Sequence, residues 1–389
     1  MSYKILALDG GANWSLLQAM ALHTLYPGVP GRQILERFDL IAANSGGSLI
    51  LADLLKNQTP AEILATFDHP NSPTSLFVEL PFPARLLSLI DLGPKFSTEK
   101  KRERIRLSLD AIQNLSMRDL DSLFPNAAKP PKMVIIAFDY DQLRAEFFRS
   151  FNAKSGATAS SISLVDAVNA SSTAPVAFFD KPAIVGQKRY WDGAIGGYNN
   201  PVMAAVVEAL IDSAAASQIV VLSLGTGVTC QVPFDHPIQR GPKEFFASRD
   251  RVCLLKDIRK LAGSILDEPP DAAGYAAYVT LRNSVVPGEG RSPATFVRLN
   301  PSIQPILSAD KLSWTAPNGL TDVELRTLIN LPAALMTDEA VAMVKTLGQK
   351  WIAGHVPNEP IRRGDDLECR IGDGTFEAAR DHWHALDTA

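Results

Sequence analysis

The stretch Tyr3-Lys4-Ile5-Leu6-Ala7-Leu8-Asp9-Gly10-Gly11-Ala12-Asn13-Trp14-Ser15 joins a short apolar run to a glycine-rich loop. A second apolar run, Phe38-Asp39-Leu40-Ile41-Ala42, leads into Ala43-Asn44-Ser45-Gly46-Gly47. Short apolar runs that end at glycine and precede helix-like segments are typical of buried strands. The two stretches therefore predict two strand–loop–helix units, with a glycine loop after one strand and a serine on a tight turn after the other.

The rest of the chain continues this alternation of strands and helices. The expected strands are 3–8, 38–43, 133–138, 188–192 and 219–224, and the expected helices are 15–26, 46–57, 164–171 and 201–213. Strands of continuous apolar character separated by helices indicate a mainly parallel sheet that is covered on both faces. We therefore expect an α/β fold with three layers.

Composition excludes several classes of protein. The 389 residues are 46% hydrophobic and 21% charged, and the net charge of −4 gives no sign of a nucleic-acid partner. The three cysteines, Cys230, Cys253 and Cys369, have no metal or disulfide spacing, which favours a reducing compartment. With no signal-peptide pattern and no apolar run near about 18 residues, a cytoplasmic protein is expected. An effector exported without a signal peptide would have the same features.

Ser45 has the surroundings that a nucleophile on a sharp turn requires. Such a turn needs small residues two positions away on each side, which Ala43 and Gly47 provide. The usual pattern is G-x-S-x-G, so Ala43 is a mild departure. At the start of a helix, free N–H groups and the positive end of the helix dipole favour a developing negative charge.

The loop Gly10-Gly11-Ala12 can supply the second part of such a site. Consecutive small residues allow backbone N–H groups to point at one oxyanion. A phosphate-binding loop is the alternative, but the glycine spacing does not complete G-x-G-x-x-G, and no G-x-x-x-x-G-K-[ST] occurs. The loop and the serine turn together favour acyl transfer, most simply the hydrolysis of an ester.

Two groups of residues could activate Ser45. A Ser–acid–His order allows Ser45, Asp192 and then His236 or His355. Alternatively, Asp192 ends a strand-like run and precedes Gly193-Ala194, where the chain turns away. A carboxylate can take the serine proton directly if burial raises its pKa.

The ordered set of motifs resembles the patatin-like phospholipases. Their D-G-G-G-x-[RK]-G loop, G-x-S-x-G turn and D-G-[GA] motif are similar to residues 9–15, 43–47 and 192–194. Further similar features are Phe96-Ser97, 170–175 with Phe178-Phe179, 224–227 and, more weakly, 296–301. The resemblance extends from about residue 3 to 227, and the order of the motifs makes it specific.

The resemblance implies a patatin-like three-layer fold and a lipid acyl hydrolase of phospholipase A type. Ser45 is then the nucleophile that forms an acyl-enzyme, and Asp192 is the base. The implied oxyanion hole consists of Gly10, Gly11, Ala12 and Asn13. The implied partners are a lipid or phospholipid substrate and, transiently, a membrane surface, with no metal, no cofactor and no required histidine.

Three residues depart from the family's loop. Ala12 replaces the third glycine, and its Cβ is unfavourable if the loop needs a positive φ. Trp14 replaces the usual Arg or Lys and could pack on an acyl chain or simply hold the loop in place, whereas Ser15 replaces the last glycine and could cap a helix. A catalytically silent protein that binds lipid or regulates a partner is therefore an alternative, alongside a Ser–His–Asp esterase or thioesterase.

The expected organisation is a hydrolase domain at 1–310 and a helical C-terminal extension at 311–389 that packs on it. Within the domain, the motifs occupy 3–227, and the Gly- and Pro-punctuated residues 228–295 are expected to form a cap or long loops. The apolar segment 70–96 could be a lid, a lipid-facing rim or a buried helix pair, and the helix pair is favoured.

Two charged segments are expected to be exposed to solvent and to have no binding role. The basic run Lys100-Lys101-Arg102-Glu103-Arg104-Ile105-Arg106 could meet anionic head groups, but a solvated helix face is favoured. Asp381-His382-Trp383-His384 could bind a metal, but a mobile chain end is favoured.

Overall fold

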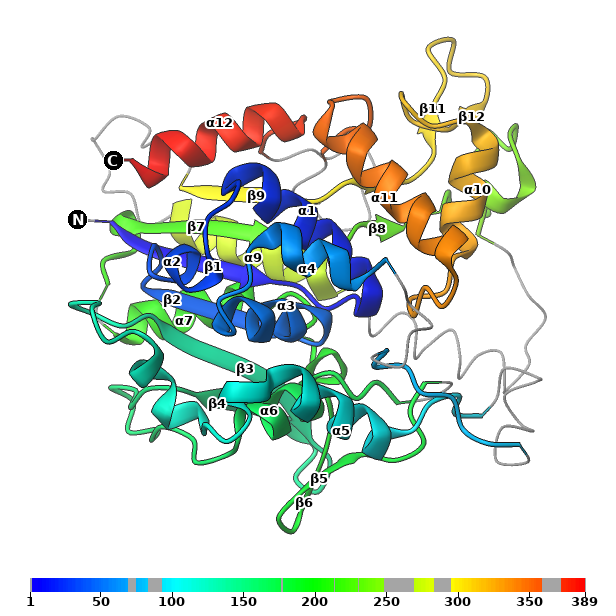
Figure 1. Ribbon diagram of the computed structural model, residues 1–389. Helices are drawn as coiled ribbons and strands as arrows, with labels where there is room; N and C mark the ends of the chain where they lie inside the picture. Colours follow the sequence, from blue (N-terminus) through cyan, green and yellow to red (C-terminus); the bar gives the residue numbers. More distant parts are fainter. Residues whose placement is uncertain are drawn as a thin grey trace.

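The computed structural model describes most of the chain (Figure 1). The described residues are 2–68, 75–82, 93–175, 178–212, 214–229, 231–247, 269–282, 295–358 and 372–388. Cys230, Cys253 and Cys369 lie outside these ranges, as do much of segment 70–96, half of 228–295 and the chain from 359 to 371.

An eight-stranded sheet with the order β5-β6-β3-β2-β1-β7-β9 forms the centre, and β4 pairs with β3. The parallel strands are β1 (Tyr3–Leu8), β2 (Leu40–Asn44), β3 (Lys132–Asp139), β7 (Ile219–Leu224) and β9 (Phe296–Leu299). The antiparallel additions are β4 (Arg144–Arg149), β5 (Ala183–Val185) and β6 (Lys188–Asp192). The prediction of a mainly parallel sheet is confirmed.

Helices cover both faces of the sheet, because successive side chains of each strand point to opposite sides. In β1, Leu6 and Leu8 join the larger apolar cluster, whereas Ile5 and Ala7 join the smaller one. Helices that contribute to the larger cluster include α1 (Leu16–Leu25), α3 (Gly46–Leu55), α5 (Thr98–Leu109), α6 (Leu164–Ser171), α11 (Asp338–Ile352) and α12 (Phe376–Asp387). Helices α7 (Val202–Ile211) and α9 (Pro269–Arg282) contribute to the smaller one. The expected three-layer α/β fold is confirmed.

The described part has further helices and strands. They are α2 (Gly31–Leu35), α4 (Pro60–Thr66), α10 (Asp322–Asn330), β8 (Val228–Thr229), β10 (Ser302–Ile303), β11 (Ile306–Leu307) and β12 (Trp314–Thr315). No helix among the described residues combines the length and the apolar character needed to cross a bilayer.

Helix α9 differs from the prediction of a cap or long loops over 228–295. Pro269 and Pro270 occupy its first turn, where a missing N–H and a fixed φ are tolerated, and an alanine-rich sequence follows. Ala277 and Leu281 are buried against the sheet beside α7. These residues therefore belong to a layer of the fold and not to a cap.

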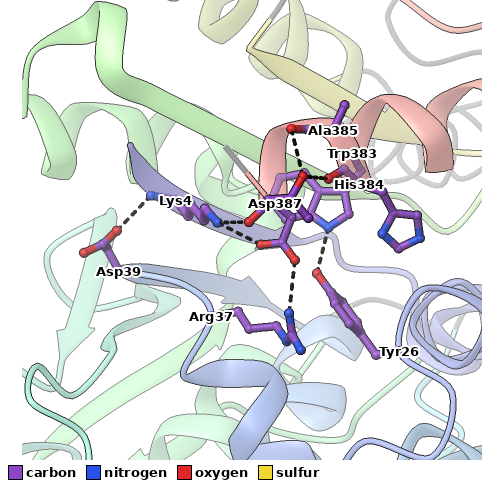
Figure 2. Close-up of polar contacts among 9 residues, drawn as sticks. Lys4, Tyr26, Arg37, Asp39, Trp383, His384, Ala385 and Asp387 are labelled. Atoms are coloured by element: carbon purple, nitrogen blue, oxygen red, sulfur yellow. Dashed lines mark hydrogen bonds and ion pairs between the residues drawn. The ribbon is translucent and has the colours of Figure 1, made fainter. Parts of the chain in front are cut away.

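The prediction of a mobile end around Asp381–His384 is wrong, because α12 packs firmly on the core. Trp383 is fully buried, its ring stacks on Phe38 at 5.6 Å, and its Nε1 donates to the hydroxyl of Tyr26 at 2.7 Å. Figure 2 shows the neighbouring polar contacts, in which Asp387 accepts from Lys4 at 2.9 Å and pairs with Arg37 at 3.3 Å.

The histidines of this helix have local roles. The Nδ1 atom of His382 lies 3.0 Å from a carboxylate oxygen of Asp373, and His384 is exposed. Among the described residues, no group of three His, Cys, Asp or Glu side chains is placed to hold a metal.

The described part of segment 70–96 is extended and contains no helix. Leu80 donates its N–H to Lys95 at 2.9 Å, and Ser97 donates to Val78 at 2.9 Å. Phe77 packs with Phe96 and Phe179, at centroid distances of 5.1 and 6.0 Å. The favoured buried helix pair is therefore absent from 75–82 and 93–96, and the segment between them lies outside the described residues.

Candidate active site

Ser45 lies on a sharp turn between β2 and α3. Its backbone angles, φ 48° and ψ −121°, are rare for a residue with a side chain and indicate a strained connection. Its N–H donates to the hydroxyl of Ser171 at 2.9 Å. A Cβ atom on Gly47 would lie 2.3 Å from the carbonyl oxygen of Leu8, which explains why the turn requires a glycine there. The turn thus has the geometry expected for a nucleophile between a strand and a helix.

Asp192 is buried at the end of β6, with 2% of its surface exposed. One carboxylate oxygen accepts from the side-chain amide of Asn44 at 3.0 Å and from the N–H of Ala194 at 2.9 Å. Burial raises the pKa of this carboxyl above its ordinary value, whereas hydrogen bonds from Ser45, Ala194 and Asn44 oppose the rise. The structure thus brings Ser45 and Asp192 together, although 147 positions separate them in the sequence.

The glycine loop lies against both residues. A Cβ atom on Gly10 would be 3.0 Å from that of Ser45, and a Cβ atom on Gly46 would be 2.5 Å from the carbonyl oxygen of Ala12. The N–H of Gly10 donates to Asn199 at 2.8 Å, and that of Asn13 donates to Ala333 at 3.2 Å. The N–H groups of Gly11 and Ala12 donate to no other described residue.

The departures from the usual loop have clear structural roles. Ala12 has a φ of 48°, so the loop does need a positive φ at this position. Ser15 occupies the expected N-cap position of α1, but its hydroxyl donates to the carbonyl of Ala12 at 2.8 Å and makes no capping hydrogen bond to the helix. The chain is already helical before α1 begins, because Ala12–Ser15 forms a single turn of 3-10 helix. Trp14 is nearly buried and lines the neighbouring cavity.

A buried ion pair supports the base of the loop. Arg298 of β9 donates to the Asp9 carboxylate at 2.5 Å and to the hydroxyl of Ser223 at 2.8 Å. Both charged side chains are nearly inaccessible, with 2% and 3% exposed. Asp9 directly precedes Gly10, so the pair fixes the point at which the loop leaves β1.

A cavity of about 600 Å³ opens over these residues. Its polar part is formed by the glycine loop, Ser45 and Asp192, and its remaining wall is largely apolar. The apolar lining includes Trp14, Leu49, Leu76, Phe77, Phe178, Phe179, Leu328, Ile329 and Leu331. No histidine is among the described lining residues; His236 instead packs on Trp314 at 5.0 Å. The candidate histidines His236 and His355 are therefore not brought to the cavity.

Lys101 corrects the prediction of a solvated basic face on α5. Lys100, Arg102 and Glu103 are exposed, but Lys101 is 2% exposed and lines the cavity. Asn44 and Lys101 are the site residues that sequence reasoning missed. Asn44 occupies a variable position of the serine motif, and Lys101 lies within a run of charges. Nothing in the local sequence therefore marks either residue as part of the site.

Comparisons with known proteins identify the family of this chain. The family model described as "Patatin-like phospholipase" matches residues 6–206. The chain therefore belongs to the patatin-like phospholipase family, which implies a hydrolase that acts on lipid esters. Among solved structures, the crystal structure of VipD from Legionella pneumophila matches all of this chain and 74% of that chain, with 12% identity and a TM-score of 0.37. A comparison with curated proteins found no significant match.

Proposed function

We propose that the protein hydrolyses acyl esters of phospholipids or related lipids through a Ser45–Asp192 dyad. The observation that carries this proposal is the buried Asp192 carboxylate, which Asn44 holds at 3.0 Å and which lines the same cavity as Ser45 on its strained turn. A carboxylate with a raised pKa is a stronger base than an ordinary aspartate, so it can accept the serine proton near neutral pH.

The geometry supports a two-step mechanism. Ser45 Oγ attacks the ester carbonyl while its proton passes to Asp192, and the resulting oxyanion accepts hydrogen bonds from Gly11 and Ala12. Collapse of this intermediate releases the alcohol, which takes the proton from Asp192, and leaves the acyl group on Ser45. Water then gives a proton to Asp192 and attacks the acyl-enzyme, and the fatty acid leaves as Ser45 Oγ takes that proton back from Asp192. Of the four residues expected to form the oxyanion hole, Gly10 and Asn13 shape the loop, because their N–H groups are already used.

The cavity wall favours an apolar acyl group. Aromatic and aliphatic side chains surround the space next to Ser45, and burying a methylene group contributes about 0.8 kcal/mol. A long acyl chain therefore has an apolar place to lie, whereas a short polar ester does not. We further propose that the protein takes its substrate from a membrane surface on transient contact.

The C-terminal residues 311–389 belong functionally to the same unit. Leu328, Ile329 and Leu331 line the cavity, and the carbonyls of Ala333 and Ala334 accept from the backbone and the side chain of Asn13. We propose that this segment, although expected as an extension, completes the catalytic cavity.

The test is the release of fatty acid from mixed phospholipid vesicles and of p-nitrophenol from an ester. Ser45→Ala and Asp192→Asn should each abolish both reactions, because they remove the nucleophile and the base. Ser122→Ala and Asp121→Asn, which alter exposed residues in the same ways, should leave both rates unchanged. Activity that is lost in Ser45→Ala but kept in Asp192→Asn contradicts the dyad and favours a histidine. A folded wild type that hydrolyses neither substrate contradicts the proposed activity.

A further inference from the structure

Lys101 is a buried cation that the mechanism above does not use. Its Nζ donates to the carbonyl of Asn169 at 3.0 Å, to the hydroxyl of Ser172 at 3.0 Å and to that of Thr173 at 2.7 Å. It also lies 4.3 Å from the centre of the Phe179 ring. None of these partners is a carboxylate, which is unusual for a lysine that is 2% exposed.

The hydrogen bonds favour the protonated form of this amine. The Ser172 hydroxyl donates its own hydrogen to Val168 at 2.7 Å, and the Thr173 hydroxyl donates to Asn169 at 2.5 Å. All three partners of Lys101 can therefore only accept. Three acceptors require three N–H bonds, which an ammonium has and a neutral amine lacks. The partners belong to the carboxyl end of α6, where the helix dipole also favours a positive charge.

The same end of α6 holds the backbone of both proposed catalytic residues. Ser171 Oγ accepts the N–H of Ser45 at 2.9 Å, and the carbonyl of Thr173 accepts the N–H of Asp192 at 2.8 Å. Lys101 binds the side chain of Thr173 and thereby joins α5 to this turn. Fixing Lys101 thus fixes the two backbone positions from which nucleophile and base project.

Other carboxylates around Lys101 are engaged elsewhere. Asp166 of α6 pairs with Arg102 at 2.6 Å, and Asp180 accepts the N–H of Thr98 at 2.9 Å. The ionisable side chains among the described lining residues of the cavity are Asp9, Lys101 and Asp192, and Asp9 pairs with Arg298. Asp192 is thus the carboxylate that faces Lys101 across the site. Burial lowers the pKa of Lys101 well below its ordinary value and raises the pKa of Asp192. The attraction between the two charges opposes both shifts, because Asp192 raises the pKa of Lys101 and Lys101 lowers that of Asp192.

We infer, building on the proposed dyad, that Lys101 is a positioning residue for the Ser45–Asp192 pair. Its ammonium group fixes the last turn of α6 and favours the ionised form of the Asp192 carboxylate. The chain thereby has a buried cation beside its base, although Trp14 stands in the loop where the family's motif has Arg or Lys.

The pH dependence of kcat/KM separates this role from simple helix capping. Lys101→Met should move the acidic limb of the profile upward by roughly one pH unit, with the loss in kcat and not in KM. Lys101→Arg retains the charge and should keep the limb in place. Lys100→Met, the same change on the exposed neighbour, should match wild type. A Lys101→Met limb at the wild-type position, or an equal shift in Lys101→Arg, overturns the inference.

A double-mutant cycle provides a readout that does not depend on activity. Lys101→Met and Asp192→Asn each leave one buried charge without its counterpart, whereas the double variant leaves none. Its Tm should exceed the additive expectation by roughly 2 °C or more at pH 7. Additive changes overturn the inference, and an inactive wild type with a non-additive cycle overturns only the proposed function.

If Lys101→Met does not fold, the inference can be tested by NMR of wild type and Asp192→Asn with isotope-labelled lysine side chains. Lys101 should then lose its proton at a lower pH in Asp192→Asn than in wild type. An unchanged titration overturns the inference.

Discussion

The side-chain amide of Asn44 donates to the carboxylate of Asp192 at 3.0 Å, and Asn44 is the residue immediately before Ser45. The strand that presents the nucleophile therefore also orients the base. Asn44 itself is completely buried, and its amide oxygen faces the hydroxyl of Ser171 at 3.4 Å. One side chain thus links β2, α6 and β6 at the point where they meet.

Asn44→Ala should lower kcat/KM at pH 6–7 by about tenfold, because the Asp192 carboxylate loses a hydrogen bond and its pKa rises further. The deficit should shrink at higher pH, where the carboxylate ionises in both proteins. Steady-state rates from pH 5 to 9 measure this effect. Asn152→Ala, at an exposed asparagine, is the control. A deficit that is the same at every pH would contradict a role through Asp192.

The wild-type rate should fall with decreasing pH at a value above the ordinary aspartate pKa of about 3.9. Only the ionised Asp192 can take the proton from Ser45, and burial raises the pKa of this carboxyl. Activity is therefore retained above the folded-state pKa and lost as the pH drops through it. An uncharged ester substrate avoids titration of the substrate. A flat kcat/KM profile down to pH 4, in protein that stays folded, would show that Asp192 is not the base.

Ala12→Gly should raise the free energy of unfolding by up to about 1 kcal/mol, because glycine adopts a positive φ without the clash of a Cβ atom. Urea denaturation measures the change. Ala215→Gly is the matched control: Ala215 is exposed with a φ of −66°, so the same substitution should lower stability by about 0.4–1 kcal/mol. Destabilisation of equal size at both positions would contradict the strain inferred at Ala12.

Arg298→Met should lower the free energy of unfolding by about 3–5 kcal/mol, because it leaves the Asp9 carboxylate buried without its cation. Adding Asp9→Asn should recover part of this loss, since the uncompensated charge disappears. Arg106→Met, at the exposed pair with Glu103, should have no measurable effect. A negligible loss in Arg298→Met would mean that the loop does not depend on this ion pair.

Trp383→Ala should destabilise the protein by about 3–5 kcal/mol, through loss of its buried ring and of the hydrogen bond to Tyr26. His384→Ala changes the exposed residue next to it and should have little effect. Thermal and urea unfolding of the two variants measure the difference. Equal stability of both variants would mean that α12 does not belong to the cooperative core.

The sequence alone predicts the elements whose pattern is local. Strands β1 and β7 and helix α6 have the expected bounds, because short, largely apolar runs and a helical pattern of apolar residues identify them directly. The partners of buried charges could not be predicted in this way. Arg298 meets Asp9 across 289 positions, and Lys101 is buried because of how α5 packs on α6. Helix α12 resembles a polar tail in sequence, and only its contact with Phe38 and Tyr26 gives Trp383 a place in the core.

The most direct test of the account is the site and rate of phosphonylation by a serine-directed fluorophosphonate. Peptide mass spectrometry of the labelled protein should place the added mass on Ser45. In Asp192→Asn the labelling rate should fall by at least about 100-fold, because the general base is lost. Label on another residue, or equal rates in wild type and Asp192→Asn, would contradict a nucleophilic Ser45 that Asp192 activates.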